Sequence, residues 1–248
     1  MADNQTRVET PDAAVTAEQA PKGGFLPSII EIFTDPLRVF ARIDAGLTWW
    51  KPFILVCAAA LVVGYFMLPF QQRLIELNQR GLSEEQLQKA VEGFGKFAPA
   101  TLIMIPIMLI IVYLVVAGIL HLVINIMSSR SSFKKTLSLV SFCGIITIVE
   151  QIIGAVILKT RGVESIESPE DLKFSLSLAP LVGEGKGLLH AILQSLSIFE
   201  IWYYVVLVLG IAAIFRISRK QAVVPVLPIW IFSVIMLLVG GKFTGGAR

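Results

Sequence analysis

The sequence predicts an all-α, polytopic membrane bundle of five transmembrane helices, with a cytoplasmic interfacial N-terminal helix in front of it. Hydrophobic residues make up 55% of the 248-residue chain and charged residues only 16%, whereas about a quarter of the residues of a soluble domain are charged. The shortage of charge is concentrated in runs close to 20 residues or longer, the length that a helix needs to cross a hydrocarbon core of roughly 30 Å. These observations exclude an ordinary soluble domain.

The N-terminal part divides into a tail and an elbow. Residues 1–24 are polar and lack the apolar run of a signal peptide, so they predict a disordered cytoplasmic tail. Residues 25–51 predict an amphipathic elbow in the plane of the membrane surface. Thr34 or Asp35 is expected to cap a helix that begins at Pro36, where the missing N–H costs nothing.

The elbow helix is expected to place apolar and basic side chains on different faces. The predicted apolar stripe consists of Leu37, Phe40 and Ile43. The basic side is expected to face anionic headgroups, and the tryptophan pair and the lysine after it are expected at headgroup level. The predicted membrane-interface anchors are Arg38, Arg42, Trp49, Trp50 and Lys51.

Five apolar runs follow the elbow and form one predicted membrane domain, residues 52–241. The expected spans are about 52–70, 98–127, 133–158, 188–215 and 221–241. Residues 242–248 are then a short outer tail. Two prolines near the start of the fifth span predict a kink or a delayed start of that helix.

The distribution of charge predicts the orientation. Two short loops carry bases without acids, namely Arg130, Lys134 and Lys135 in one and Arg216, Arg219 and Lys220 in the other. Such loops are expected in the cytoplasm, which places the N-terminus inside and the C-terminus outside. The other two loops mix acids and bases, and each is expected to carry a short amphipathic helix, beginning at Ser83 and Ser168 respectively.

A few ionisable groups fall inside the predicted spans, where each is a functional candidate because its burial in lipid is costly. Counting 1.5 Å per residue places Glu150 and Glu200 at nearly the same depth. The pair could bind a cation or relay a proton, or a protonated glutamate could hydrogen-bond across a helix interface. The predicted intramembrane polar site consists of Glu150, Glu200, Gln151, Tyr203 and His121.

The other polar and small residues in the spans have packing interpretations. His121 is expected to hydrogen-bond Ser138 or Ser141 of the next span, and His190 is expected at the membrane surface. The glycines expected to permit close helix packing are Gly64, Gly118, Gly144, Gly154 and Gly210.

No enzyme motif is found in the sequence. A His-Glu-x-x-His zinc motif is missing, and Gly183–Gly187 lacks the spacing of a phosphate-binding loop. Cys57 and Cys143 lie in apolar runs and are expected to be small buried hydrophobes. We therefore expect no catalysis, no metal, no cofactor and no binding of nucleic acid.

Three stretches carry a resemblance to a known family. They are "DPLRVFARI…TWWKPFIL" in the elbow, "SSFKKTLSLVSF" at 131–142 and "SIFEIWYYVVLVLGIAAIFRISRKQA" at 197–222. Together they resemble bacterial members of the Yip1-domain family. The resemblance implies a five-span bundle with a cytoplasmic N-terminus in the bacterial cytoplasmic (inner) membrane. Eukaryotic relatives associate with Rab-type GTPases and with each other, but this chain lacks the Asp-Leu-Tyr-Gly-Pro-like motif typical of that branch.

The sequence thus predicts a non-enzymatic membrane protein of Yip1 type, with a trafficking-like role in membrane organisation. Its expected partners are the lipid bilayer, copies of itself or other membrane proteins. The alternative is a small transporter or channel that uses the intramembrane carboxylate pair. A third hypothesis is that lateral grooves beside the elbow handle lipids.

Overall fold

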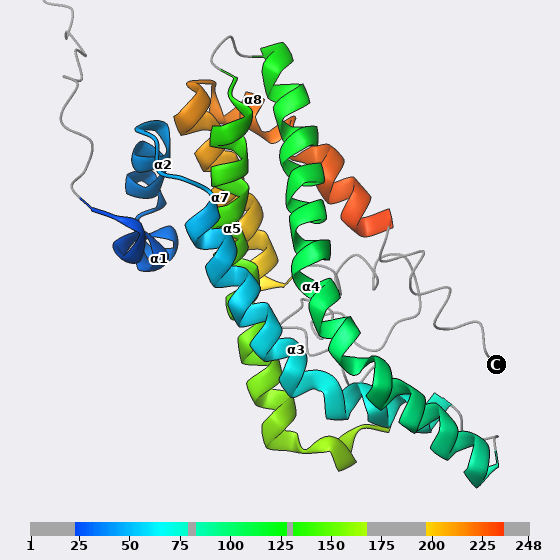
Figure 1. Cartoon of the computed structure of the whole chain (residues 1–248). Coiled ribbons are helices and arrows are strands. Elements are labelled where there is room, and N and C mark those ends of the chain that lie inside the picture. The colour runs from blue at the N-terminus through cyan, green and yellow to red at the C-terminus, as the bar shows by residue number, and fades with distance from the viewer. Residues whose placement is uncertain (1–22, 79–82, 128–130, 168–196, 236–248) are drawn as a thin grey trace, which may run out of the picture.

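The computed structural model describes residues 23–78, 83–127, 131–167 and 197–235, and these parts of the chain form a helical bundle (Figure 1). Four helices of the described residues are long and apolar enough to cross a membrane. They are α3 (Trp50–Asn78), α4 (Glu84–Met127), α5 (Phe133–Arg161) and α7 (Ile198–Phe215). The predicted all-α membrane bundle is confirmed.

The fourth and fifth predicted spans are described only in part. Helix α7 covers about the last two-thirds of the fourth, and residues 188–196, with His190, lie outside the described residues. The fifth contains α8 (Arg219–Val223) and a helical segment at 227–235, separated by a turn at 224–226. Pro225 lies in this turn, which agrees with the predicted interruption of the helix. Residues 1–22, 168–196 and 236–248 are also outside the description, so the two tails and the helix start at Ser168 stay predictions.

Helix α5 forms the centre of the bundle. Every residue from Thr136 to Ile146 is buried, and a helix buried on all its faces must be surrounded by other elements. Helices α1, α2, α3, α4 and α7 all contact α5. The hydroxyl groups of Thr136 and Ser141 donate to backbone carbonyls of the same helix, 3.1 and 2.8 Å away, so these buried polar groups are satisfied.

Three of the predicted packing glycines lie where helices touch. A side chain at Gly64 would collide with Ile105 of α4, one at Gly144 with Tyr113 of α4, and one at Gly210 with Leu139 of α5. Gly118 differs, because nothing lies within 4 Å of the position that its Cβ would take. Close approach of helices therefore explains three of these glycines but does not explain Gly118.

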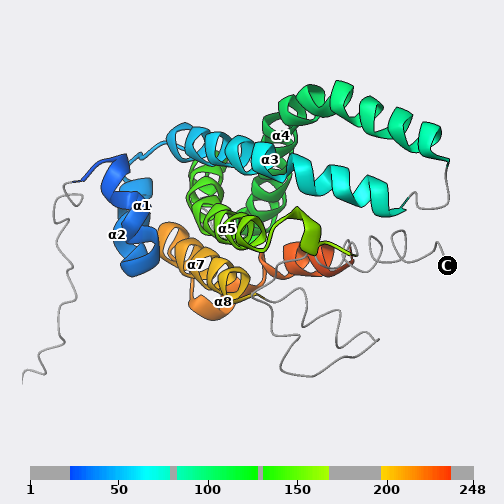
Figure 2. The same cartoon turned by 90° about the horizontal axis from the view of Figure 1, so that it is seen from below.

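The elbow consists of two short helices, α1 (Phe25–Thr34) and α2 (Pro36–Asp44), packed beside the bundle (Figures 1 and 2). Helix α2 begins at Pro36 as predicted. Its buried side chains include Phe40 and Ile43, and it contacts α7 and α5. Leu37 was expected on the same apolar stripe, but it is 54% exposed.

The loop between the first two spans differs from the prediction. Ser83 and Gln86 do form the expected capping box, with bonds of 3.2 and 3.4 Å. The helix that starts there is no separate surface helix, however, but continues into the membrane span as the first part of α4. This part runs alongside the end of α3, and both extend sideways from the bundle (Figures 1 and 2). Pro69 in α3 and Pro99 in α4 interrupt the backbone hydrogen bonds near these bends.

Candidate functional site

The two glutamates that were expected at one depth lie on neighbouring helices. Glu150 lies on α5 and Glu200 in the first turn of α7, and the two helices are in contact. Both side chains are half-buried. In a medium of low dielectric constant, a shared proton or a bound cation would relieve the repulsion between two such groups.

Glu200 is fixed from both sides by hydrogen bonds. Ser197 caps α7 and accepts a 2.9 Å bond from the backbone N–H of Glu200. The hydroxyl group of Tyr204 donates to Oε1 of Glu200 over 3.4 Å and lies 3.2 Å from the hydroxyl oxygen of Ser233. Ser233 in turn donates to the carbonyl of Trp230 over 2.8 Å. This chain of polar groups links α7 to the helical segment at 227–235, and Ser233 was not part of the predicted site.

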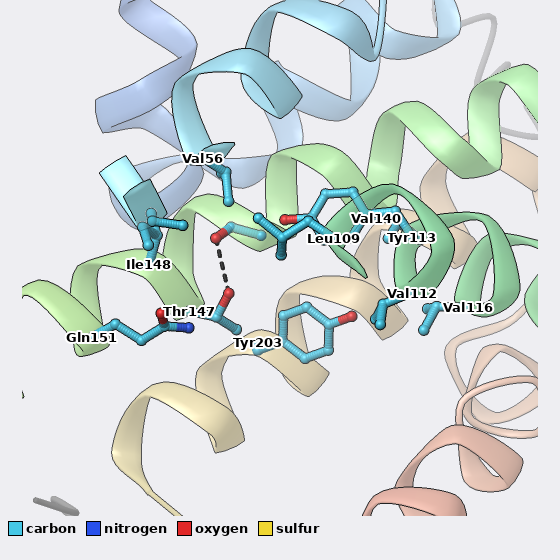
Figure 3. A pocket seen from close by; sticks show the side chains of 12 residues that line it. Val56, Leu109, Val112, Tyr113, Val116, Val140, Thr147, Ile148, Gln151 and Tyr203 are labelled. Atoms are coloured by element: carbon cyan, nitrogen blue, oxygen red, sulfur yellow. Dashed lines mark hydrogen bonds between the residues drawn. The ribbon is translucent and has the colours of Figure 1, made fainter. Parts of the chain in front are cut away.

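A cavity of about 200 Å³ lies between α3, α4, α5 and α7 (Figure 3). Gln151 and Tyr203, both predicted site residues, contribute to its wall, but neither Glu150 nor Glu200 does. Thr147 also lines it, and its hydroxyl group donates to the carbonyl of Gly144 over 2.9 Å. The rest of the wall is apolar, apart from one further tyrosine. Its apolar lining residues are Val56, Ala60, Leu109, Val112, Val116, Val140, Gly144 and Ile148.

That tyrosine, Tyr113 of α4, is a further residue that the sequence prediction did not include. It is only 7% exposed, and its hydroxyl group has no hydrogen-bond partner among the described residues. The hydroxyl lies against Gly144, on the wall of the cavity. Leaving such a group unpaired costs about 1–3 kcal/mol, so a hydrogen-bond acceptor in the cavity would be stabilised there. The sequence could not predict this contact, because a single tyrosine in an apolar run does not indicate which glycine of another helix it will touch.

His121, the fifth predicted site residue, lies apart from the glutamates. Its Nδ1 is 2.9 Å from the hydroxyl oxygen of Ser131, and its ring packs edge-on against Phe133 with 5.7 Å between ring centroids. The expected hydrogen bond to Ser138 or Ser141 is replaced by contacts with Ser131, before α5, and with Phe133, the first residue of α5. His121 therefore joins the end of α4 to the start of α5.

The elbow anchors are placed differently from the prediction at one position. Arg42 was expected to face lipid headgroups, but it is 5% exposed. Its guanidinium forms a two-pronged salt bridge with Glu31 of α1, in which Nη2 is 3.0 Å from Oε1, and Nη1 donates to the Ser28 hydroxyl over 2.9 Å. Arg42 is thus used to hold α1 and α2 together. This pairing lowers the pKa of Glu31 below its ordinary value, chiefly through the hydrogen bond from Arg42.

The other four predicted anchors are exposed or partly exposed. Arg38 is exposed and pairs with Asp35 at 2.9 Å. Trp50 is 47% exposed, and the ammonium of Lys51 lies 5.4 Å from the centroid of its ring. Trp49 is more buried and packs against Phe53. Their role as membrane anchors stays a prediction.

A second ion pair joins the elbow to the bundle. Lys135, in the first turn of α5, pairs with Asp44 at the end of α2. Both side chains are about one-third exposed, so this pair contributes less to stability than a buried one. Lys135 is one of the basic residues from which a cytoplasmic loop was predicted.

Comparison with known proteins assigns the family. A family model described as the Yip1 domain matches residues 30–241, which include most of the elbow and every described span. This chain belongs to the Yip1 domain family. The resemblance expected from the sequence is therefore confirmed, and the chain is a membrane protein.

A curated relative agrees with this Yip1 assignment. The chain is 27% identical to "Membrane protein YknW" of Bacillus subtilis (strain 168) over 229 residues, which cover 88% of this chain and 90% of that protein. No solved structure gives a significant match.

Proposed function

We propose that this Yip1-domain protein is non-enzymatic and acts within the bilayer by association with other membrane helices, including those of its own copies. The observation that carries the proposal is the poor burial of α4. The apolar stretch of α4 is the most hydrophobic of the four spans, yet only 11% of it is buried, compared with 50% for α5. Helix α4 therefore offers a long apolar surface.

The exposed surface of α4 includes a regular stripe. Met104, Met108, Ile111 and Val115 are each about half exposed, and their spacing places them on one face of the helix. In a membrane, helices associate by van der Waals packing of such faces, and methionine side chains adapt to partners of different shape. The stripe is therefore suited to a partner helix.

Site-specific photo-crosslinking in native membranes tests this proposal. A photoreactive side chain at Met108 or Ile111 is expected to give discrete protein adducts, with an identical result in independent preparations. The same group at Val205 of α7, which is 40% exposed, is the matched control and is expected to label lipid only. Lipid adducts alone at all three positions would rule out the proposed use of α4.

One observation favours a second function, that of a small transporter or channel. Glu150 and Glu200 lie on two helices in contact, and the neighbouring residues Gln151 and Tyr203 line a cavity. A pathway through this layer predicts that Glu150→Gln and Glu200→Gln each reduce ion or proton flux into proteoliposomes. The cavity wall contains neither glutamate, which favours association over transport.

A further inference from the structure

Helices α3 and α5 leave an apolar groove of about 490 Å³ between them. Nine of its ten lining residues are apolar, and Val62, Phe66 and Val156 are each at least 44% exposed. The neighbouring position Gly64 faces α4 instead, where it meets Ile105. The groove is thus on a face of α3 that α4 does not cover, and in a membrane this face meets lipid.

A second hollow of about 440 Å³ continues the groove toward the end of α5. The two share Phe66 and Lys159, so they form one surface. The second hollow adds the ring of Tyr65 and the backbone turn at Gly162, which ends α5. The combined groove is apolar along the helices and polar at one end.

Lys159 supplies the charge at that end. It is exposed, and its Nζ lies 4.3 Å above the centroid of the Phe66 ring. Among the described residues no carboxylate pairs with it. Tyr65 is also exposed, and exposed tyrosines together with a lysine near the end of a span mark the level of the lipid headgroups. The groove therefore runs from the hydrocarbon region to a cation at headgroup level.

We propose that this groove binds one anionic phospholipid, with an acyl chain between α3 and α5 and the phosphate group on Lys159. The apolar walls suit the acyl chain, and the ammonium, which no carboxylate of the described residues pairs with, suits a net negative headgroup. A packed protein helix would cover Lys159 without neutralising it, which is costly. The inference goes beyond the association through α4, because the groove lies between other helices.

Native mass spectrometry of the purified full-length protein tests the proposal. The probes are phosphatidylglycerol and phosphatidylethanolamine with identical acyl chains. We expect one molecule of phosphatidylglycerol to bind, and to bind more tightly than phosphatidylethanolamine does. Lys159→Gln is expected to weaken the binding of phosphatidylglycerol about fivefold. Lys134→Gln, which removes an exposed lysine at the other end of α5, is the matched control and should not change binding. Ala155→Phe, which fills the groove, should abolish it.

The outcomes separate the parts of the proposal. Equal binding of the two lipids, or equal binding by the wild type and Lys159→Gln, would overturn the assignment of the headgroup. Tight binding that survives Ala155→Phe would overturn the assignment of the acyl chain. If Ala155→Phe does not fold, as judged by its thermal unfolding, Val156→Trp at an exposed position of the same groove replaces it. Crosslinking from Met108 does not depend on any of these changes, so failure here leaves the association through α4 open to its own test.

Discussion

The burial of one charge, that of Arg42, determines which side chains of the elbow are exposed to the membrane. Because Arg42 faces Glu31 and Ser28, its charge is neutralised inside the elbow. The side chains left on the outside are largely apolar, with Leu26 73% and Ile30 69% exposed. A short helix pair with its ion pair inside and leucine and isoleucine outside is suited to lie within the interfacial region of the membrane rather than above it.

The ion pair predicts a dependence of stability on pH. The pKa of Glu31 is lower in the folded protein than its ordinary value of 4.5, so the folded state binds fewer protons than the unfolded state in this range. The stability that Glu31 contributes is therefore complete above about pH 4.5 and is lost as the pH falls through the folded-state pKa. Thermal unfolding of the wild type and of Glu31→Gln can be measured in detergent between pH 3 and 7, in steps of about one pH unit. The difference in stability between the two proteins should shrink as the pH falls.

A matched control for this titration is Glu85→Gln. Glu85 also pairs with a base, Lys89, but its side chain is 78% exposed, and such pairs are worth about 0–1 kcal/mol. Glu85→Gln should therefore follow the wild-type curve closely. A constant difference between wild type and Glu31→Gln across the whole pH range would show that the carboxylate charge of Glu31 does not stabilise the elbow.

The contact between Gly144 and Tyr113 predicts a second effect of a single residue. The Cβ added by Gly144→Ala would lie 1.8 Å from the tyrosine oxygen, so the tyrosine must move, and overpacking of this kind costs about 1–3 kcal/mol. Gly118→Ala on α4 meets open space and should be neutral or slightly stabilising. Chemical unfolding in detergent measures both. Equal effects of the two substitutions would mean that Tyr113 does not rest on Gly144.

At the scale of elements, the attachment of the elbow depends on a three-helix contact. Phe40 of α2 is 1% exposed, and its ring lies near Gly210 of α7 and Leu139 of α5. The missing side chain of Gly210 is what allows this ring and Leu139 to enter the same space. The elbow is therefore packed onto the bundle and is more than a linker before α3.

This contact predicts that Phe40→Ala loosens the elbow. Removal of a buried phenylalanine costs about 3–5 kcal/mol, and the loss should appear as faster amide hydrogen exchange in residues 25–44. Leu37→Ala on the same helix removes a side chain that is 54% exposed, and its exchange should match the wild type. Slow exchange in both variants would show that α1 and α2 are held by other contacts, such as the pair between Lys135 and Asp44.

The elements were largely predictable from the sequence, whereas the contacts between them were not. Long apolar runs predict spans because crossing the bilayer requires a fixed length of helix, and Pro36 and Ser83 predict helix starts through local chemistry. The partner of Arg42 lies 11 residues earlier on another helix, so local patterns place Arg42 on a basic face and miss its burial. The capping box at Ser83 likewise predicts where α4 begins but contains no information about how far the helix continues.

The candidate site shows the same division. Counting along the helices places Glu150 and Glu200 at one depth, and the structure places them on two helices in contact. Whether two residues at one depth face each other depends on the rotation of each helix, which packing sets. That rotation brings Tyr113 onto Gly144 and turns His121 toward Ser131, and neither result follows from position along the chain.

At the scale of the whole molecule, successive long helices alternate in direction. Figure 1 shows α8 and the start of α5 at one end of the bundle, with the end of α5 at the other. The bases of both short loops, among them Lys134 and Lys220, therefore lie at the same end. Glu85 belongs to the opposite end, since it stands at the start of α4. If the basic end is cytoplasmic, both short basic loops lie on the cytoplasmic side, as the positive-inside rule expects.

Cysteine labelling in intact cells tests that orientation. Both native cysteines are buried, so they should contribute little background to labelling with a maleimide that does not cross membranes. Glu85→Cys is expected to react in intact cells, and Lys220→Cys only after the cells are opened. The reverse pattern would place the basic loops and the N-terminus outside, and labelling of both variants in intact cells would contradict a single fixed topology. Because both positions are exposed, a difference between them reports the side of the membrane rather than burial within the bundle.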